Sequence, residues 1–522
     1  MVNIGRPSRG CTVCRKRKIK CDEASPGCSY CFKKQIVCPG YQDAFDLAFR
    51  DQSIVAERSV QRRKKATDRQ GHGRISCQGS SNLSLVPDLP AVNIQMASST
   101  SLSTSSRVQP SLSEDYSKYA LDFFCSSYLT LPRPPEVRQG CFELLYPVFK
   151  ASDPSSPLRP ATYAVGSVLL EAWILRSPGN ISTARPFYLK ALSKLRAILS
   201  DANATITDDI LMAVLILEVY EGLVSFFKGD RSKGTHVSGA VALVHNRKSD
   251  LSQDLVVAVR NNMVDTAIQS SQPVPPVVTP WKDVAVNSPK NAAERVDEID
   301  FKVANILALA ATELPKIDAT SKAGSEALQR LLDAAEDIDT ELAAWASSVP
   351  ESWAPIVVSG PQAIPASVKT AGLYGDSCAI YSHILIANTL NRYRCFRSRL
   401  NSLIITCHIK FQTQCSPTKT AKSLEIIQQM VDGICSSVPF YLGDRTARGR
   451  LDVTIHYPQI PHQPLPEKHL LAAPTLGGWF LIARLKDALS LNCSLRQGQH
   501  EWIRGQMGRL IRIYGIEPST KP

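Results

Sequence analysis

The chain has 522 residues, of which 44% are hydrophobic and 20% charged, and it carries a formal net charge of +13. Its length allows two to four folded units joined by linkers. Its longest apolar run, residues 210–217, is much shorter than the roughly 20 residues of a membrane span, and the N-terminal sequence MVNIGRPSRG has no apolar signal core, so we expect neither a membrane partner nor secretion.

The N-terminal segment is basic and rich in cysteine. Residues 1–70 hold 16 Lys and Arg against 7 Asp and Glu, and such a segment is expected to bind a polyanion. Six cysteines follow the spacing C-x2-C-x6-C-x6-C-x2-C-x6-C: Cys11, Cys14, Cys21, Cys28, Cys31 and Cys38. In a reducing compartment, such clustering indicates metal ligation rather than disulfides.

The cysteine pattern is one 11-residue motif used twice, CTVCRKRKIKC and CSYCFKKQIVC. Ile19 and Ile36 fall at the same position of the two halves, so we predict a pseudo-twofold pair of short helices, with Pro26 and Gly27 forming the turn between them. Six thiolates can satisfy two tetrahedral zinc ions if two of them bridge. We therefore expect two zinc ions, whose binding, worth about 10–16 kcal/mol in small zinc peptides, supplies most of the folding free energy of the segment.

The motif resembles that of the fungal binuclear zinc-cluster (Zn2Cys6) transcription factors. The six cysteines, the stretch CRKRKIKCDE at residues 14–23, Pro26 and the stretch CPGY at residues 38–41 carry the resemblance. It implies that Cys11 and Cys28 bridge the two metals. It also implies that Arg17 and Lys18, just before the third cysteine, enter the major groove of DNA at a CGG triplet.

The cations of the motif differ between the two halves. A guanine offers O6 and N7 as two acceptors to one Lys or Arg, and Lys18 is our candidate for that contact. Gln35 and Val37 replace Lys18 and Lys20 in the second half, which predicts that the first half alone reads bases. The other cations should bind phosphates, hold the DNA backbone or shield the cluster. They are Arg15, Lys16, Lys20, Lys33 and Lys34.

Two linker segments are expected after the zinc cluster of residues 1–42. Residues 43–69 favour a helix of mixed charge, and its run Arg62, Arg63, Lys64 and Lys65 indicates either a nuclear import signal or extra phosphate contacts. Many relatives dimerise through a coiled coil here, but sustained heptads are absent from this segment. Residues 70–115 are rich in serine and without periodicity, which predicts a disordered tether.

Residues 116–522 are expected to form a large all-α region, because apolar residues recur three and four positions apart. We predict helices over 162–176, 188–199, 207–227, 235–245, 302–314, 324–347, 374–396, 422–435, 476–490 and 499–515. Proline-rich stretches at 272–289 and 458–474 are read as surface loops. Residues 333–345, DAAEDIDTELAAW, are a weak candidate for an activation segment.

This region is similar to the fungal-specific regulatory domain that follows the zinc cluster in one branch of the family. The similarity rests on RPFYLKALSKLRAIL from Arg185, HVSGAVALV from His236, SSVPFYLGD from Ser436 and GGWFLIARL from Gly477. In the family such regions mediate activation, dimer contacts or responses to small molecules. A homodimer, co-regulators of the transcription machinery and a small-molecule effector are therefore the partners that the resemblance implies, besides double-stranded DNA.

The rest of the chain shows no motif for catalysis. It lacks G-x-S-x-G, a Walker-type phosphate loop and H-E-x-x-H, so we expect no enzyme and no catalytic residue. His236 is read as a capping or packed residue rather than a general base. The nine cysteines outside the cluster lack ligand spacing, and we expect most of them to be buried as small apolar residues.

We thus predict a nuclear, sequence-specific DNA-binding transcription factor of the RNA polymerase II type. By analogy with the family, it regulates a metabolic or secondary-metabolite pathway. The alternative is a zinc-containing interaction protein that binds nucleic acid without sequence preference. A purely structural zinc knot and a metal store or redox sensor are further readings of the six cysteines.

Overall fold

The computed structural model divides the chain into two compact units, Met1–Ser105 and Ser106–Pro522. In the first unit it describes residues 11, 13, 14, 17, 19–22, 24, 28–34, 36 and 38. In the second it describes residues 114–129, 137, 141–173, 181–201, 203–228, 234–246, 251–278, 290–411, 417–447, 454–491, 493 and 495–515. The predicted linker helix at 43–69 and its candidate import signal lie outside the described residues, as does the predicted tether up to residue 113.

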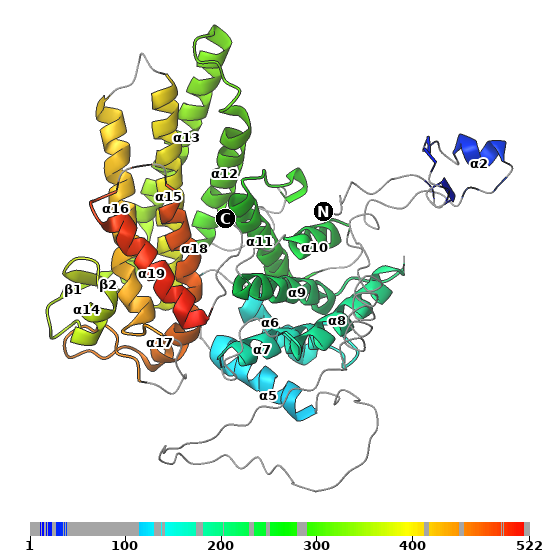
Figure 1. Ribbon diagram of the computed structural model, residues 1–522, viewed down its shortest axis with the longest axis horizontal. Helices are drawn as coiled ribbons and strands as arrows, with labels where there is room; N and C mark the ends of the chain where they lie inside the picture. Colours follow the sequence, from blue (N-terminus) through cyan, green and yellow to red (C-terminus); the bar gives the residue numbers. More distant parts are fainter. Residues whose placement is uncertain are drawn as a thin grey trace, which may run out of the picture. The chain divides into compact units, whose positions relative to one another are not determined.

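The first unit contains the zinc-binding motif and the short helix α2, Ser29–Lys33. The second unit is largely helical, as predicted (Figure 1). Its first part comprises α5 (Glu114–Phe124), the π-helical turn η1 (Cys125–Leu129), α6 (Cys141–Ala151), α7 (Leu158–Trp173), α8 (Ala184–Leu199), α9 (Asp208–Phe227), α10 (Thr235–His245) and α11 (Gln253–Ser270).

Helix α9 lies at the centre of this first part. It packs against α6, α7, α8, α10 and α11. All eight residues of the apolar run at 210–217 are buried, because a helix that is apolar on every side must be enclosed by others. Among the helices of the described residues, α9 is the one long and apolar enough to cross a bilayer, with a mean hydropathy of 2.0, and 61% of its apolar window is buried inside the unit. It is therefore a core helix of the fold.

The second part is built around long helices. It comprises α12 (Ala292–Glu313), α13 (Lys322–Ser348), the 3-10 turn η3 (Glu351–Trp353), β1 (Ile356–Ser359), α14 (Ala366–Gly372), β2 (Ser377–Ile380), α15 (Ile384–Lys410), α16 (Pro417–Leu442), α17 (Glu467–Ala472), the π-helical turn η4 (Ala473–Gly477), α18 (Gly478–Leu489) and α19 (Gln499–Tyr514). Helices α12, α13, α15 and α16 run alongside one another, and α18 packs on α15 and α16 (Figure 1).

Helix α13 shows how local sequence produces one of these elements. The Ser321 side chain accepts a hydrogen bond from the backbone N–H of Gly324 and so caps the first turn. Leucines and other apolar residues recur at helical spacing and are buried, ending with Trp345, whose Nε1 donates to the Ala292 carbonyl at 2.7 Å. The acidic candidate at residues 333–345 thus belongs to a helix whose apolar face already packs inside the bundle.

The structure corrects the prediction of a helix over 374–396. Residues 377–380 form strand β2, which pairs antiparallel with β1 in the register Ile356 with Ile380 and Ser359 with Ser377. Helix α15 begins only at Ile384, where the Nδ1 of His383 accepts from the Leu385 N–H. The sequence SCAI is too short for its periodicity to distinguish a strand from a helix. Its pairing with β1, about 20 residues away, decides the outcome.

Other helices were mispredicted because they bury polar side chains in tertiary contacts, and these side chains interrupt the apolar pattern of the sequence. Helix α12 starts ten residues earlier than predicted, and α11 was not predicted at all. Both carry buried polar side chains, among them Asp297 and Asp300 on α12 and Asn261 on α11. Helices α5 and α6 were also missed. The stretch 458–474 was read as a surface loop, but it contains α17 and part of η4.

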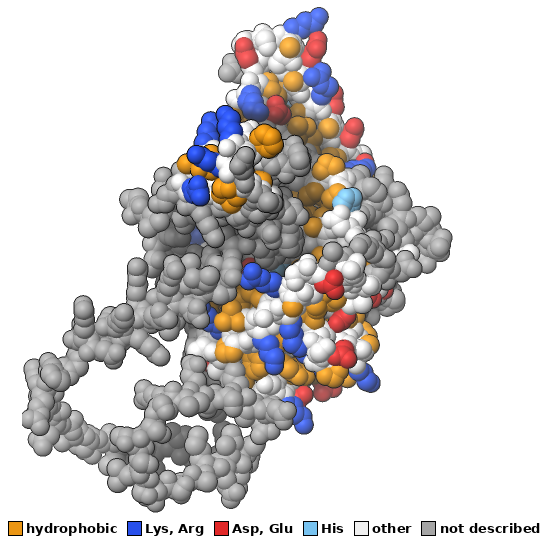
Figure 2. Space-filling model, turned by 90° about the vertical axis from the view of Figure 1, so that its right-hand side faces the viewer, with side chains coloured by type: hydrophobic (Ala, Val, Ile, Leu, Met, Phe, Trp, Pro, Cys, Tyr) orange, Lys and Arg blue, Asp and Glu red, His pale blue; other side chains and the backbone are white. Residues whose placement is uncertain are grey.

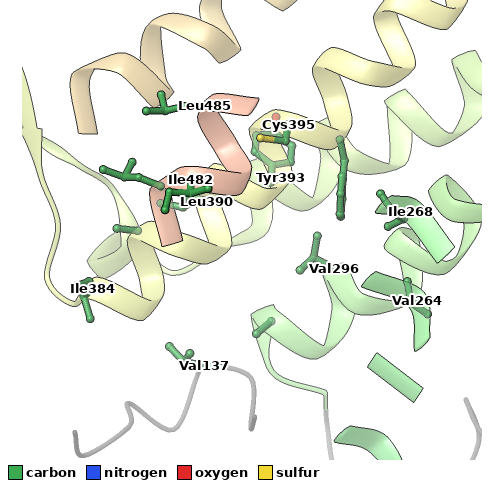
Figure 3. Packing of buried hydrophobic residues seen from close by; sticks show 14 of the residues in the cluster. Val137, Val264, Ile268, Val296, Ile384, Leu390, Tyr393, Cys395, Ile482 and Leu485 are labelled. Atoms are coloured by element: carbon green, nitrogen blue, oxygen red, sulfur yellow. The ribbon is translucent and has the colours of Figure 1, made fainter. Parts of the chain in front are cut away.

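One continuous hydrophobic core joins both parts of the helical unit. Figure 3 shows Val296 of α12 and Val264 and Ile268 of α11 on one side of Tyr393 of α15, and Leu485 of α18 on the other side. Apolar side chains from residues 120 to 514 therefore belong to the same buried cluster.

A buried ionic cluster ties α11, α12 and α15 together. The Arg392 guanidinium lies 2.8 Å from an Asp297 carboxylate oxygen and 3.5 Å from an Asp265 oxygen, and it also contacts Asp300. Asn261 donates to the second Asp297 oxygen at 3.1 Å. Burial disfavours the charged guanidinium, but the three carboxylates outweigh it and raise the pKa of Arg392 above its usual value. The cluster therefore requires its cation.

Among the cysteines outside the zinc motif whose side chains the structure describes, most are buried. Cys378, Cys395, Cys407 and Cys435 are buried, whereas Cys125 and Cys493 are half-buried. Burial raises the pKa of the Cys378 thiol to about 12 and that of Cys407 to about 11, so these thiols are poor nucleophiles. The side chains of Cys77, Cys141 and Cys415 lie outside the described residues.

The imidazole of His469 is buried, and we expect it to make the helical unit sensitive to acid. Its ring packs against Phe440, with centroids 4.2 Å apart, and against Tyr457 at 5.2 Å. Burial lowers the pKa of His469 to about 4 from 6.5. Between these two pH values His469 is protonated in the unfolded chain but neutral in the folded protein. The free energy of unfolding should therefore be undiminished by His469 above pH 6.5, and it should fall by about 3 kcal/mol as the pH drops toward 4.

This loss is measured by urea unfolding at several pH values. His469→Phe should flatten the stability profile between pH 6.5 and 4, and His245→Gln, at an exposed position of α10, should leave it unchanged. If His469→Phe loses as much stability as the wild type between pH 6.5 and 4, other titrating groups cause the loss.

Candidate metal centre and DNA-binding surface

The sulfur atoms of the six cysteines lie in two groups of four that share two members. One group is Cys11, Cys14, Cys21 and Cys28, and the other is Cys11, Cys28, Cys31 and Cys38; within each group the sulfurs lie within 4.8 Å of one another. The Sγ of Cys11 lies 3.8 Å from that of Cys28 and 3.8 Å from that of Cys31, and the Sγ atoms of Cys14 and Cys28 are 3.7 Å apart. A tetrahedral zinc with bonds of about 2.3 Å requires sulfur separations of about 3.8 Å.

The donor set therefore fits two zinc ions that share Cys11 and Cys28. Four of the six thiols are fully buried. Burial and neighbouring thiols raise the pKa of Cys31 to about 12, because several thiolates cannot ionise side by side without a cation. Zinc held by these six cysteines would supply that positive charge in place of the protons, and its binding would be coupled to folding of the segment.

Backbone hydrogen bonds repeat the predicted pseudo-twofold relation. Arg17 N donates to Val13 O at 3.1 Å, as Lys34 N does to Tyr30 O at 3.1 Å. Ile19 and Ile36 donate in the same way to Cys14 and Cys31, at 3.1 and 2.9 Å. The first sulfur of each half also accepts from the backbone N–H three residues on, at 3.5 Å in the first half and 3.4 Å in the second. The duplicated sequence thus folds into duplicated turns.

Comparison with known proteins agrees with this geometry. The family model of the fungal Zn(2)-Cys(6) binuclear cluster domain matches residues 9–47. The chain carries this domain. No curated protein and no solved structure matches the chain. The Zn(2)-Cys(6) domain binds two zinc ions and belongs to a family of DNA-binding transcription factors, which are not enzymes and are generally nuclear. The protein is accordingly a zinc-cluster DNA-binding regulator.

Asp22 joins the two halves of the Zn(2)-Cys(6) domain, a role that the sequence analysis missed. Its carboxylate accepts hydrogen bonds from the Ser29 N–H at 3.1 and 3.2 Å and from the Ser29 hydroxyl. These bonds, led by that of the hydroxyl, lower the pKa of Asp22 below its usual value. The negative charge also lies at the N-terminal end of α2, where helix N–H groups favour it. The only signal in the sequence was an acidic residue directly after the third cysteine.

Four cations of the Zn(2)-Cys(6) domain are described, and all are exposed: Arg17, Lys20, Lys33 and Lys34. Figure 2 shows Lys and Arg side chains of this domain gathered on the face turned to the viewer. The side chain of Arg17 is held, because its Nη1 donates to the Tyr30 hydroxyl at 3.0 Å. Arg15, Lys16 and Lys18 lie outside the described residues, as do the import-signal residues 62–65.

The helical unit places His236 where a packed residue was expected. His236 is buried, and its Nε2 lies 3.0 Å from a Glu221 oxygen that also accepts from the Tyr188 hydroxyl at 2.6 Å. Its backbone N–H donates to Glu218 at 3.2 Å. These contacts fasten the start of α10 to α8 and α9.

Proposed function

We propose that the protein is a nuclear transcription factor of the RNA polymerase II type that reads a CGG-like triplet through the first half of its Zn(2)-Cys(6) domain. The observation that carries the proposal is the pair of four-sulfur groups sharing Cys11 and Cys28, surrounded by exposed cations. Such an arrangement lets a very small segment present positive charge from a rigid frame.

Each part of the domain has a task in this proposal. All six cysteines ligate zinc, with Cys11 and Cys28 bridging. Lys18 contacts the O6 and N7 acceptors of a guanine in the major groove, beside Arg17. The remaining cations, Arg15, Lys16, Lys20, Lys33 and Lys34, contact phosphates, which fix the register of the domain without specifying bases.

The remaining segments complete the proposed organisation. Residues 1–42 form the DNA-binding domain, residues 43–69 a basic linker helix whose residues 62–65 direct nuclear import, and residues 70–115 a tether. Residues 116–522 form the regulatory domain, through which a second copy, co-regulators or a small-molecule effector act. Control of a metabolic or secondary-metabolite pathway is part of the proposal on the strength of the family resemblance.

Selection of binding sites from a random duplex library tests the proposal directly. The full-length, zinc-loaded protein is used at near-physiological salt, where nonspecific phosphate binding is weak. Enrichment of CGG triplets is the expected result, and one triplet or two at fixed spacing distinguishes a monomer from a dimer. A protein that holds two zinc ions yet enriches no sequence would favour the alternative, a zinc-containing interaction protein that binds nucleic acid nonspecifically.

Substitution of Lys18 should abolish discrimination between bases. In Lys18→Ala, affinity for the selected site should fall by roughly 5- to 150-fold, while affinity for unrelated duplexes changes little, because a lost two-acceptor contact to guanine costs about 1–3 kcal/mol. Lys34→Ala is the matched control in the second half and should weaken binding to both kinds of DNA alike. If Lys18→Ala also weakens both alike, Lys18 is a phosphate contact and the triplet is read elsewhere.

A further inference from the structure

We propose that Tyr30, in the second half of the Zn(2)-Cys(6) domain, is a positioning residue for DNA binding that holds Arg17 of the first half in place. The inference rests on the proposed function and adds a residue to it. Arg17 Nη1 donates to the Tyr30 hydroxyl at 3.0 Å, although the two residues are 13 positions apart. The Arg17 side chain is exposed and Tyr30 is half-buried. Arg17 therefore faces solvent, whereas Tyr30 is part of the packed metal-binding segment.

The metal-binding frame determines where the Tyr30 hydroxyl lies. Tyr30 is on α2 between Cys28 and Cys31, whose sulfurs belong to the groups described above. The start of α2 is also fastened to the first half by the bonds from Ser29 to Asp22. A tyrosine ring has few rotamers, so anchoring its backbone largely places its hydroxyl. The hydroxyl is thus a fixed acceptor for an otherwise flexible side chain.

The contact breaks the pseudo-twofold relation of the domain. By the register of the two motifs, Val13 corresponds to Tyr30, and Arg17 corresponds to Lys34. The equivalent contact in the other direction would join Lys34 to Val13, and valine has no hydroxyl to accept it. The backbone bonds of the two halves match, but this side-chain bond occurs in one direction only. The asymmetry favours the first half as the one that meets DNA in a defined geometry.

The chemistry of the pair suits an acceptor-rich partner. The phenol accepts one N–H from Arg17 and can still donate its own proton, while the guanidinium has further N–H donors for phosphate or base acceptors. A free arginine side chain loses considerable rotamer entropy when it is immobilised in an interface. Holding Arg17 before DNA arrives reduces that loss, which should appear as tighter binding.

The test is a double-mutant cycle in the full-length, zinc-loaded protein. Tyr30→Phe removes the hydroxyl and keeps the ring. We expect two zinc ions to remain bound and affinity for the selected duplex to fall by about 3- to 10-fold, in line with the net contribution of one ordinary, solvent-exposed hydrogen bond. Arg17→Ala should then reduce DNA affinity by a smaller factor in the Tyr30→Phe background than in the wild type. The matched pair, Tyr30→Phe with Lys34→Ala, should show independent effects.

Three results would overturn the role of Tyr30. In the first, Tyr30→Phe binds DNA with the affinity of the wild type. In the second, the fold-losses in affinity caused by Tyr30→Phe and Arg17→Ala multiply in the double variant, so the two residues act independently. In the third, Tyr30→Phe loses zinc, and the role of Tyr30 is purely structural. The cycle is measured on the tightest-binding duplex whether or not a triplet is selected. Failure of the triplet proposal is seen in the wild type alone, so the two failures are distinguishable.

Discussion

Cys28→Ser is expected to strip both zinc ions from the protein and to reduce DNA affinity by at least about 100-fold. Cys28 belongs to both four-sulfur groups, and a serine hydroxyl does not ionise to replace a bridging thiolate. The loss should be large because metal binding supplies about 10–16 kcal/mol in comparable small zinc sites. Zinc per chain is counted by native mass spectrometry, and affinity is measured by fluorescence anisotropy with a labelled duplex.

Two comparison variants sharpen this prediction. Cys38→Ser removes a sulfur that belongs to one group only, so the protein should keep at least one zinc ion. Cys493→Ser changes a half-buried thiol of the helical unit and should change neither zinc content nor affinity. Equal zinc loss in Cys28→Ser and Cys38→Ser would argue against a shared ligand, and so would two retained zinc ions in Cys28→Ser.

Arg392→Met should destabilise the helical unit by about 3–5 kcal/mol, a large part of the stability of an ordinary domain. Methionine preserves much of the volume, but the side chains of Asp297 and Asp300, which are 4% and 0% exposed, lose the guanidinium that faces them. Removing one partner from a buried ionic cluster costs far more than the cluster itself contributes. The change is measured as the free energy of unfolding in urea.

A surface ion pair offers the control for this prediction. Lys302 lies 2.7 Å from Glu341, but both side chains are about half exposed, so Lys302→Met should cost less than about 1 kcal/mol. Adding Asp300→Asn to Arg392→Met should recover part of the loss, because it removes one of the buried charges. If the double variant is no more stable than Arg392→Met alone, the cost comes from packing rather than from charge.

Local sequence patterns predicted several elements closely. The limits of α10 agree with its predicted range of 235–245, and α19 was predicted within one residue. In these helices the apolar stripe and the residues that flank it indicate the same helix limits. Helix α11 was missed because Arg260 and Asn261 are buried on it. The sequence pattern alone is too polar to predict a packed helix, since the partners of these side chains lie on other helices.

The zinc site was predicted almost entirely from sequence, since ligand identity and spacing are local properties: six cysteines in a duplicated motif suffice to indicate two tetrahedral sites. The tertiary structure alone decided what depends on distant partners. Examples are the strand at 377–380, the hydrogen bonds that Ser29 donates to Asp22 and the contact of Arg17 with Tyr30. The Arg392 cluster likewise gathers carboxylates from residues 265 to 300 around a cation nearly one hundred positions further on. Such contacts depend on how helices pack, and no short stretch of sequence contains that information.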